Sequence, residues 1–229
     1  MSHWRSLAEE MVREQIEGRG VRGAVLEAMA SVPRHLFVSE NLAERAWIDS
    51  PLPIGEDQTI SQPYMVGRMT ELLAPSPGER VLEVGTGSGY QAAVLCAMGV
   101  KVVSMERIKK LALESRERLA RLGYDAEVLW TDGSAEDRPE GPFDGVIVTA
   151  AAPELERWWT DVLAKGGRLV APVSVMSGGQ RLLLRKKLGN GRIKDTWHEY
   201  CRFVPLLKGK KGDEPLRPNN EPTNGPNRE

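Results

Sequence analysis

Cysteine and histidine are scarce in this sequence. Its 229 residues include two cysteines, Cys96 and Cys201, and three histidines, His3, His35 and His198. The two cysteines are far apart in the sequence, and the pattern supports neither a zinc site nor a disulfide framework. The histidines are equally scattered and form no catalytic pair. We therefore expect reduced thiols, no bound metal and no histidine-dependent catalysis.

An excess of one charge and long apolar runs are also lacking. Thirty-one basic residues against thirty-two acidic ones leave a formal net charge of −1. This balance gives no global field that would draw the protein onto nucleic acid or a membrane. No apolar run approaches the ~18–20 residues that a membrane helix needs, and the charged stretch 5–19 contains no signal-peptide apolar region. We expect a soluble, cytoplasmic monomer that selects its partner through a local site.

A glycine-rich turn follows a short apolar run. The run 81–84 leads into the turn Gly85-Thr86-Gly87-Ser88-Gly89, and helix-forming residues begin at Tyr90. Glycine permits positive φ and lets a ligand approach the backbone, while amides at the start of the next helix face that ligand. Residues 101–105 read as the second strand, and Glu106 at its end can accept hydrogen bonds from ribose hydroxyls. Together these features predict a nucleotide-cofactor site.

The glycine turn alone leaves more than one cofactor open. A dinucleotide fold prefers Gly-x-Gly-x-x-Gly, in which the close backbone approach serves a pyrophosphate. Here the third glycine comes one residue early, and Glu83 lies two residues before the first glycine. This arrangement suits a ligand with a cationic amino-acid end and no phosphate, such as S-adenosylmethionine. Nicotinamide or flavin binding, and a glycine turn without any ligand, are the alternatives.

Strand-like and helix-like segments alternate from residue 81 onward. We expect strands at 81–84, 101–105, 126–130, 145–149 and 168–173, with helices from 90, near 111–122 and around 155–163. This pattern predicts an α/β doubly wound, mostly parallel sheet. Segment 181–184 and a segment ending at 204 have no long helix between them, so an antiparallel pair is expected at one edge.

Helical spacing also precedes this sheet, and a change in composition follows it. Residues 7–16 and 25–29 predict an N-terminal helical cap, and the proline-rich stretch 49–63 predicts a shaped loop. We expect one domain, 1–208, in which 1–78 form the cap and loop and 79–208 form the Rossmann-like core. Residues 209–229 contain one large apolar residue, Leu216, too little to offset the entropy of ordering. They predict a disordered tail.

Four segments together resemble the protein-L-isoaspartate (D-aspartate) O-methyltransferase family. They are Thr59-Ile60-Ser61-Gln62-Pro63-Tyr64-Met65, Glu83-Val84-Gly85-Thr86-Gly87-Ser88-Gly89-Tyr90-Gln91, Val148-Thr149-Ala150-Ala151-Ala152-Pro153 and Phe203-Val204-Pro205-Leu206. The resemblance extends from about residue 10 to 208. The first segment discriminates most, because the glycine turn occurs in many methyltransferases. The family tends to have valine in place of Met105 and glycine in place of Thr131, changes that should adjust cofactor packing without removing a functional group.

The resemblance implies a class I S-adenosylmethionine-dependent methyltransferase fold, possible exchange of the last two strands, and an activity. Such an enzyme transfers a methyl group to the α-carboxyl of L-isoaspartyl residues, and less well D-aspartyl residues, in damaged proteins. The ester then collapses to a succinimide, which starts repair. Isoaspartyl proteins and peptides would be the partners. Two rivals stay open: another methyltransferase of this class acting on a small molecule or RNA, and a non-enzymatic binding protein with this fold.

The same resemblance assigns roles to individual residues. Ser61 matches the family's active-site serine and would hold the substrate carboxylate. The cofactor would contact Glu83, Gly85, Thr86, Gly87, Ser88, Gly89, Glu106, Arg107, Asp132, Gly133 and Thr149. The substrate would contact Thr59, Ile60, Gln62, Pro63, Ala150, Ala151, Val204, Pro205 and Leu206. From the residues alone, Ser61 could equally cap a turn, Asp132 could be a turn residue, and the apolar members could be core.

Overall fold

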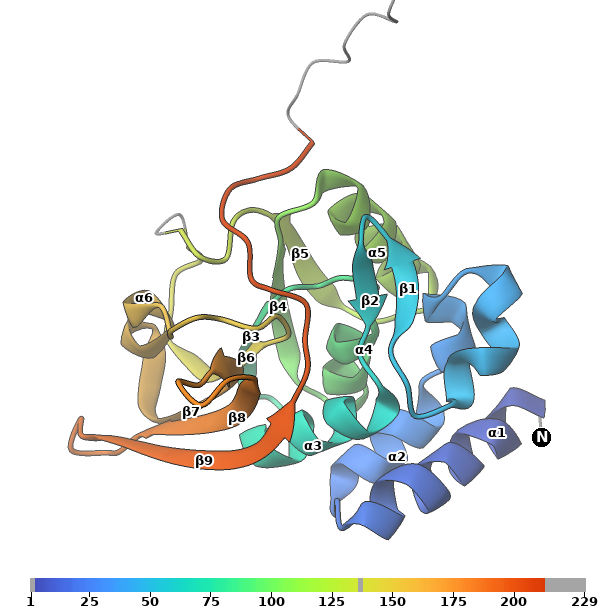
Figure 1. Cartoon of the computed structure of the whole chain (residues 1–229), viewed down its shortest axis with the longest axis horizontal. Helices are drawn as coiled ribbons and strands as arrows, with labels where there is room; N and C mark the ends of the chain where they lie inside the picture. The colour runs from blue at the N-terminus through green and yellow to red at the C-terminus, as the bar shows by residue number, and fades with distance from the viewer. Residues whose placement is uncertain (1–2, 136–137, 213–229) are drawn as a thin grey trace, which may run out of the picture.

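A seven-stranded sheet organises the protein. The structure is a computed structural model that describes residues 3–135 and 138–212, and in these residues the strand order is β5-β4-β3-β6-β7-β8-β9 (Figure 1). The strands are β3 (Arg80–Val84), β4 (Lys101–Glu106), β5 (Ala126–Trp130), β6 (Phe143–Val148), β7 (Leu163–Ser174), β8 (Gln180–Lys187) and β9 (Ile193–Cys201). Strands β3 to β7 pair in parallel, whereas β8 is antiparallel to both of its neighbours. The predicted α/β sheet with an antiparallel edge pair is confirmed, and β7, β8 and β9 follow chain order.

Helices cover the two faces of this sheet unequally. Helices α3 (Pro63–Leu73), α4 (Tyr90–Ala97) and α5 (Lys109–Arg121) contribute to one apolar cluster, whereas the short α6 (Arg157–Asp161) contributes Trp158 and Trp159 to the other. Strand β3 supplies both clusters, because alternate side chains of a strand point to opposite faces. Val81 packs in the first cluster and Leu82 in the second. The core therefore holds β3, and the loop that follows it, in a fixed position.

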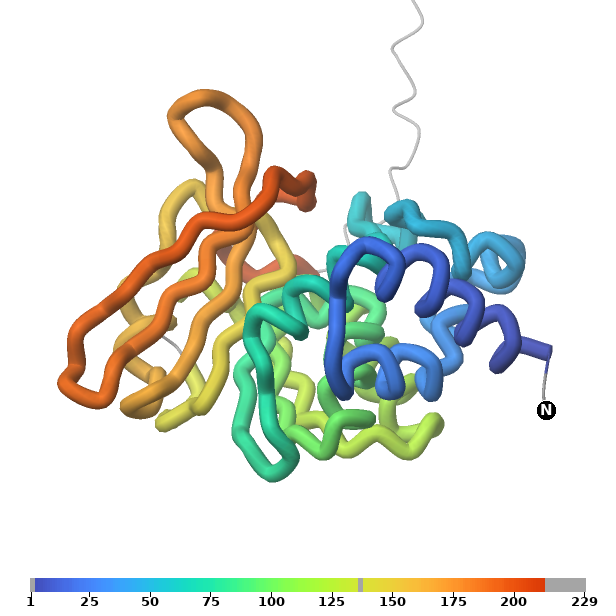
Figure 2. The backbone as a smooth tube through the Cα atoms, turned by 90° about the horizontal axis from the view of Figure 1, so that it is seen from below, coloured from blue at the N-terminus to red at the C-terminus, as the bar shows by residue number. Residues whose placement is uncertain are grey.

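The predicted N-terminal cap is built from several short helical pieces. They are α1 (His3–Met11), a π-helical turn (Val12–Ile16), α2 (Ala24–Ser31) and the 3₁₀ helices Glu17–Arg19, Arg34–Phe37 and Glu40–Trp47. The expected helix over 7–16 is thus α-helical only in its first part. Figure 2 shows the cap on the side of the molecule away from β7, β8 and β9. The cap packs against α3 and α4.

A short hairpin lies within the predicted loop 49–63. Strands β1 (Leu52–Gly55) and β2 (Gln58–Ile60) pair antiparallel, and the two turn residues, Glu56 and Asp57, have φ values of 53° and 58°. Two successive positive φ angles match the twist of a tight hairpin, although glycine or asparagine usually occupies such positions. Ser61 follows this hairpin directly and lies in the loop between β2 and α3.

Several segment boundaries differ from the prediction. Helix α6 has five residues and β7 begins at Leu163, because a bulge lets this strand pair with β6 earlier than the sequence pattern indicates. Strand β9 ends at Cys201, so residues 202–204 connect the sheet to the site. The predicted disorder from 209 onward is wrong for 209–212, which make hydrogen bonds to the domain. Residues 213–229, the rest of that predicted tail, lie outside the described residues.

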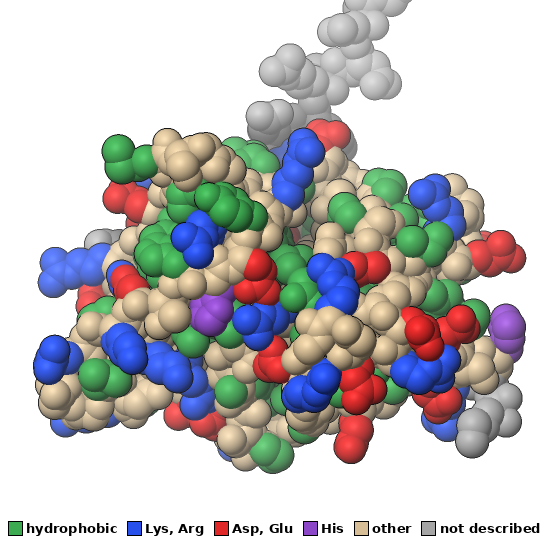
Figure 3. Space-filling view, turned by 60° about the horizontal axis from the view of Figure 1, so that its bottom comes forward, with side chains coloured by type: hydrophobic (Ala, Val, Ile, Leu, Met, Phe, Trp, Pro, Cys, Tyr) green, Lys and Arg blue, Asp and Glu red, His purple; other side chains and the backbone are tan. Residues whose placement is uncertain are grey.

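Charges of both signs are mixed on the surface. Figure 3 shows acidic and basic side chains interspersed over one face, which agrees with the balanced composition. Within residues 3–135 and 138–212, no helix is long and apolar enough to cross a membrane.

Candidate functional site

Three adjoining pockets lie where β3, β4 and β6 end. Open α/β sheets place ligands at this carboxyl edge. The central pocket lies between the β3–α4 turn and the β2–α3 loop, the β4–β5 pocket lies beside Arg107 and Asp132, and the rim pocket opens beside Arg202. The central and β4–β5 pockets share Glu106, whereas the central and rim pockets share Ser61. One continuous site therefore runs from the sheet edge to the surface.

Most residues predicted from the sequence form the walls of these pockets. The central pocket contains Thr59, Ile60, Ser61, Glu83, Gly85, Thr86, Gly87, Ser88, Glu106, Thr149, Ala150 and Val204. The β4–β5 pocket adds Arg107, Asp132, Gly133, Pro205 and Leu206, and the rim pocket adds Gln62. These residues come from six connections that are far apart in the sequence. The fold brings them together.

Three predicted site residues lie outside the pocket walls that the described residues form. Pro63 is buried at the start of α3, where a proline suits the first turn. A Cβ on Gly89 would lie 3.2 Å from Leu119, so this glycine lets α4 approach α5. Ala151 exchanges backbone hydrogen bonds with the 204–206 segment and fixes that segment beside the site. All three support the site without facing it.

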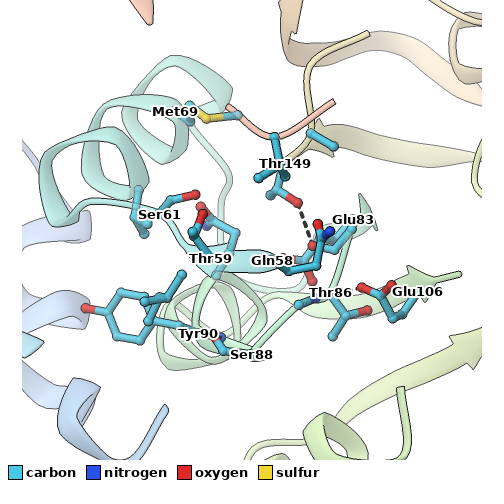
Figure 4. Close-up of a pocket in the computed structure, with 17 residues that line it drawn as sticks. Gln58, Thr59, Ser61, Met69, Glu83, Thr86, Ser88, Tyr90, Glu106 and Thr149 are labelled. Carbon is cyan, nitrogen blue, oxygen red and sulfur yellow. Dashed lines mark hydrogen bonds between the residues drawn. The ribbon is translucent and has the colours of Figure 1, made fainter. Parts of the chain in front are cut away.

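The β3–α4 turn owes its shape to a close approach by Thr149. Gly85 has φ of 101°, and a Cβ at this position would lie 2.4 Å from the Thr149 hydroxyl oxygen. That hydroxyl donates a hydrogen bond to the Gly85 carbonyl (Figure 4). A side chain at Gly85 would therefore displace Thr149 and strain the backbone.

Glu83 is a fully buried carboxylate in the wall of the central pocket. Its Oε2 accepts a hydrogen bond from Ser104, whose hydroxyl also contacts the Thr86 hydroxyl. Its Oε1 is buried and has no hydrogen-bond partner among the described residues. Desolvation raises the pKa of Glu83 to about 8, and the nearby Glu106 carboxylate acts in the same direction. A buried acceptor of this kind suits a cationic ligand group.

Glu106 joins the end of β4 to the glycine turn. Its Oε2 accepts a hydrogen bond of 2.9 Å from the Gly87 amide, and its Oε1 accepts one of 2.9 Å from the Ile108 amide. Burial raises the pKa of this carboxyl, and the amide hydrogen bonds oppose the rise. Each oxygen keeps a lone pair for a further donor. Glu106 therefore faces both the central and the β4–β5 pockets with acceptor capacity.

Ser61 lies on the opposite side of the central pocket from Glu106. Figure 4 shows Thr59 and Ser61 on one side, and Thr86 and Glu106 on the other. The Ser61 carbonyl accepts a hydrogen bond of 2.8 Å from Arg34. Within the part of the chain that the structure describes, the Ser61 hydroxyl has no hydrogen-bond partner. It is therefore available to a ligand that spans the central and rim pockets.

The chain after β9 closes the β4–β5 pocket. Figure 1 shows this segment running along the ends of the strands. The Gly209 amide donates a hydrogen bond to Asp132, and Arg107 donates one of 2.8 Å to the Gly209 carbonyl. Lys211 forms an ion pair of 2.8 Å with Glu56 in the β1–β2 hairpin. Burial alone would raise the pKa of Asp132, but hydrogen bonds from Ser134 and Gly209 lower it overall. We call residues 207–212 the strap.

Sequence reasoning missed several residues of this site. Gln58, Met69, Tyr90 and Gln91 line the central pocket, and Arg202 lines the rim pocket. Tyr90 and Gln91 follow the glycine turn directly, so their position was a usable signal. Arg202 and the strap gave no such signal, because surface-like composition does not reveal where a segment docks. In residues 3–135 and 138–212, no group of three or more His, Cys, Asp or Glu side chains could hold a metal ion.

Comparisons with known proteins agree with this geometry. A family model for "Protein-L-isoaspartate(D-aspartate) O-methyltransferase (PCMT)" matches residues 6–211. The protein-L-isoaspartate O-methyltransferase of Methanospirillum hungatei is 50% identical over 205 residues, which cover 87% of this chain and 92% of that protein. A solved protein-L-isoaspartate O-methyltransferase has a TM-score of 0.80 at 25% identity, covering 90% of this chain and 67% of that one. The structure of a putative protein-L-isoaspartate O-methyltransferase from Plasmodium falciparum, solved with S-adenosyl-L-homocysteine, has a TM-score of 0.74 at 27% identity. The match covers 91% of this chain and 100% of that one.

Proposed function

This chain belongs to the protein-L-isoaspartate(D-aspartate) O-methyltransferase family, and from this membership we infer that it methylates the free α-carboxyl of L-isoaspartyl residues in damaged proteins. D-aspartyl residues are the weaker substrates. S-adenosylmethionine is the cofactor, and when bound it supplies an electrophilic methyl group. The backbone nitrogen of the following residue then attacks the carbonyl carbon of the methyl ester, methanol leaves, and a succinimide forms. Hydrolysis of this ring returns a fraction of the substrate molecules to the normal aspartyl linkage.

The pocket walls fit this cofactor. Glu83 Oε1 has no hydrogen-bond partner among the described residues, and a buried carboxylate oxygen needs a hydrogen-bond donor. It would accept a hydrogen bond from the ammonium group at the methionine end of the cofactor. Glu106 would accept from the ribose hydroxyls, since it stands at the junction of two pockets. Asp132 and Gly133 would hold the adenine in the β4–β5 pocket. The substrate would bind to the residues of the rim pocket, beside Ser61.

Substrate activation in this site needs no base. A carboxyl group with an ordinary pKa near ~3.5–4 is ionised at neutral pH, so one of its oxygens already carries the attacking electron pair. We propose that the Ser61 hydroxyl donates a hydrogen bond to the other oxygen and so fixes the direction of attack. Fixed orientation of two reactants can remove roughly 7–11 kcal/mol from a barrier. Exclusion of water when substrate and cofactor are bound would strengthen the attraction between the carboxylate and the cationic cofactor.

One observation carries the role of Ser61. Ser61 lines both the central pocket, which also contains Glu83 and Glu106, and the rim pocket beside Arg202. The acidic groups that suit the cofactor line the central side, and we propose that a polypeptide substrate enters from the rim side. The boundary between the two pockets is therefore where the two reactants would meet.

Single-turnover methylation of an isoaspartyl peptide by Ser61→Ala tests this role. Loss of one hydrogen bond to a charged group is worth roughly 1.5–3 kcal/mol, so the rate should fall about ten- to a hundredfold while cofactor affinity stays near the wild-type value. Glu127→Ala, which changes an exposed carboxylate on β5, is the matched control. Wild-type rates in Ser61→Ala would remove the hydroxyl from the mechanism. A methylated Ser61 would refute direct transfer to the substrate.

We further propose that the enzyme acts as a monomer in the cytoplasm. Cys96 and Cys201 are free thiols, which agrees with a reducing compartment. Sedimentation of the full chain at assay concentrations tests the monomer, and a dimer mass would contradict it.

A further inference from the structure

Arg34 is a fully buried arginine in the N-terminal cap. It begins the 3₁₀ helix Arg34–Phe37, and its exposed fraction is 0%. Arginine is almost never fully buried unless it is paired with an acid. Asp49 is the acid whose field acts on it, yet the Asp49 carboxylate is engaged by Arg19 at 2.6 Å. Across residues 3–135 and 138–212, Arg34 forms no ion pair. Burial accordingly lowers its pKa from the ordinary value.

Two backbone carbonyls take the place of the missing acid. Arg34 Nε donates a hydrogen bond of 2.7 Å to the Ala46 carbonyl, and Nη2 donates one of 2.8 Å to the Ser61 carbonyl. The guanidinium carbon lies 4.6 Å from the centre of the Tyr90 ring, at the start of α4. One charged group thus ties together the cap, the Ser61 loop and the helix that follows the glycine turn.

The Ser61 loop joins β2, whose last residue Ile60 pairs with Leu52, to the start of α3. The carbonyl of the next residue, Gln62, accepts hydrogen bonds from the Met65 and Val66 amides of α3, and Pro63 has no amide hydrogen to donate. Arg34 therefore holds the Ser61 carbonyl, while α3 holds the carbonyl of the next peptide plane along the chain. Without the bond from Arg34, the backbone at Ser61 could shift, and the Ser61 side chain would shift with it relative to the pocket. A misplacement of about 1 Å at a reacting centre can cost about a hundredfold in rate.

We propose that Arg34 is a positioning residue for methyl transfer: its buried guanidinium fixes the Ser61 carbonyl and thereby the direction in which the Ser61 hydroxyl meets the substrate carboxylate. This inference rests on the proposed role of Ser61. It also accounts for the burial of an unpaired charge, which is costly where packing alone is needed. A neutral side chain of similar length would fill the same space without holding both carbonyls.

A double-mutant cycle separates positioning from general stability. Arg34→Met is made in the wild-type chain and in Ser61→Ala, and single-turnover methylation of an isoaspartyl peptide is measured in all four proteins. If Arg34 acts through the Ser61 hydroxyl, Arg34→Met lowers the rate about tenfold in the wild-type chain and by less than about twofold in Ser61→Ala. Cofactor affinity should stay within about twofold. Gln15→Ala, which removes a 2.9 Å bond from another cap side chain to the Trp47 carbonyl, should leave the rate unchanged.

The other outcomes overturn specific claims. An equal fall in both backgrounds, or no fall in either, would contradict positioning by Arg34 while leaving the role of Ser61 intact, provided that Ser61→Ala itself is slow. Wild-type rates in Ser61→Ala would refute the proposed function of Ser61 and the inference with it. Thermal melting shows whether each variant is folded at the assay temperature. If Arg34→Met is unfolded, Arg34→Lys, which keeps the charge but has no planar fork, takes its place in the cycle and is judged by the same non-additivity.

Discussion

The Gly209 amide lies 2.6 Å from Asp132 Oδ2 and donates a hydrogen bond to it across 77 positions of sequence. Arg107 binds the carbonyl of the same glycine, and the Lys211 amide donates to the Arg107 carbonyl. The strap is therefore attached to two residues that line the β4–β5 pocket. Opening this pocket on the strap side requires these bonds to break.

Truncation after Lys208 should weaken cofactor binding. It removes Gly209 and Lys211, so Asp132 and Arg107 lose their strap partners, and the segment 205–207, which lines the pocket, loses its attachment to them. The loss of one or two hydrogen bonds to charged groups predicts a rise of about tenfold or more in the Kd for S-adenosylhomocysteine, measured by calorimetry. Truncation after Gly212 keeps these contacts and is the control. Equal Kd values for the two truncated chains would show that the strap does not contribute.

Gly85→Ala should impair the cofactor site more than Gly78→Ala does. Both glycines have positive φ, so both substitutions strain the backbone, but only the Cβ at Gly85 meets Thr149, at 2.4 Å. A Cβ at Gly78 has open space within 4 Å among the described residues. Gly85→Ala should therefore lower cofactor affinity by about tenfold or more, and Gly78→Ala should change mainly the melting temperature. Similar affinities for both variants would contradict the close approach.

Glu83 should make cofactor binding release a proton. In the free enzyme its pKa is about 8, so it is mostly protonated at pH 7. A cationic group beside the carboxylate favours the ionised form. Calorimetry in buffers of different ionisation enthalpy should detect release of about one proton at pH 7 and much less at pH 9. Glu83→Gln should abolish the release. If Glu83→Gln releases as many protons as the wild type, the released proton comes from another group.

The same shift predicts a pH dependence of stability. The folded pKa of Glu83 lies above its ordinary value of 4.5, so the folded state binds the proton more tightly than the unfolded state does. Its stabilising contribution is fully present below about pH 4.5 and is lost as the pH rises through about 8. Between these values the free energy of unfolding of the cofactor-free wild type should fall relative to that of Glu83→Gln. Denaturant titrations at pH 5 and pH 8 provide the comparison, and parallel curves for the two proteins would contradict it.

Glu106→Ala should lower cofactor affinity about ten- to a hundredfold. The substitution removes an acceptor for ribose hydroxyls and also frees the Gly87 amide, which loosens the glycine turn. The exposed β5 variant Glu127→Ala should bind as the wild type does. Unchanged affinity in Glu106→Ala would remove this carboxylate from the site.

The sequence predicted the sheet and the acidic side of the site because both depend on local pattern. Apolar runs with strand spacing gave β3 and β4, and the carboxyl ends of parallel strands meet at one edge. That rule places Glu106 beside the glycine turn. Ser61 was identified through the family resemblance, since a hydroxyl in a proline-rich loop has several ordinary explanations.

Other features of the site could not be predicted, because they depend on distant backbone groups. The buried Arg34 donates hydrogen bonds to carbonyls that are 12 and 27 positions away in the sequence. From the sequence alone, an arginine is expected at the surface. Gly209 belongs to a segment whose composition indicates disorder, yet the turn after β5 supplies its partner. The hairpin turn has positive φ at both Glu56 and Asp57, and the Asn-Gly or Asp-Gly pair that usually indicates such a turn is absent.

Transfer of a labelled methyl group to matched peptides tests the central claim most directly. Two peptides of identical sequence, one with L-isoaspartate and one with normal aspartate at the same position, are incubated with the full chain and labelled S-adenosylmethionine. The account predicts base-labile label on the isoaspartyl peptide, background label on the aspartyl peptide, and slow labelling of the isoaspartyl peptide by Ser61→Ala. Equal labelling of the two peptides, or none of either by folded enzyme that binds the cofactor, would contradict it.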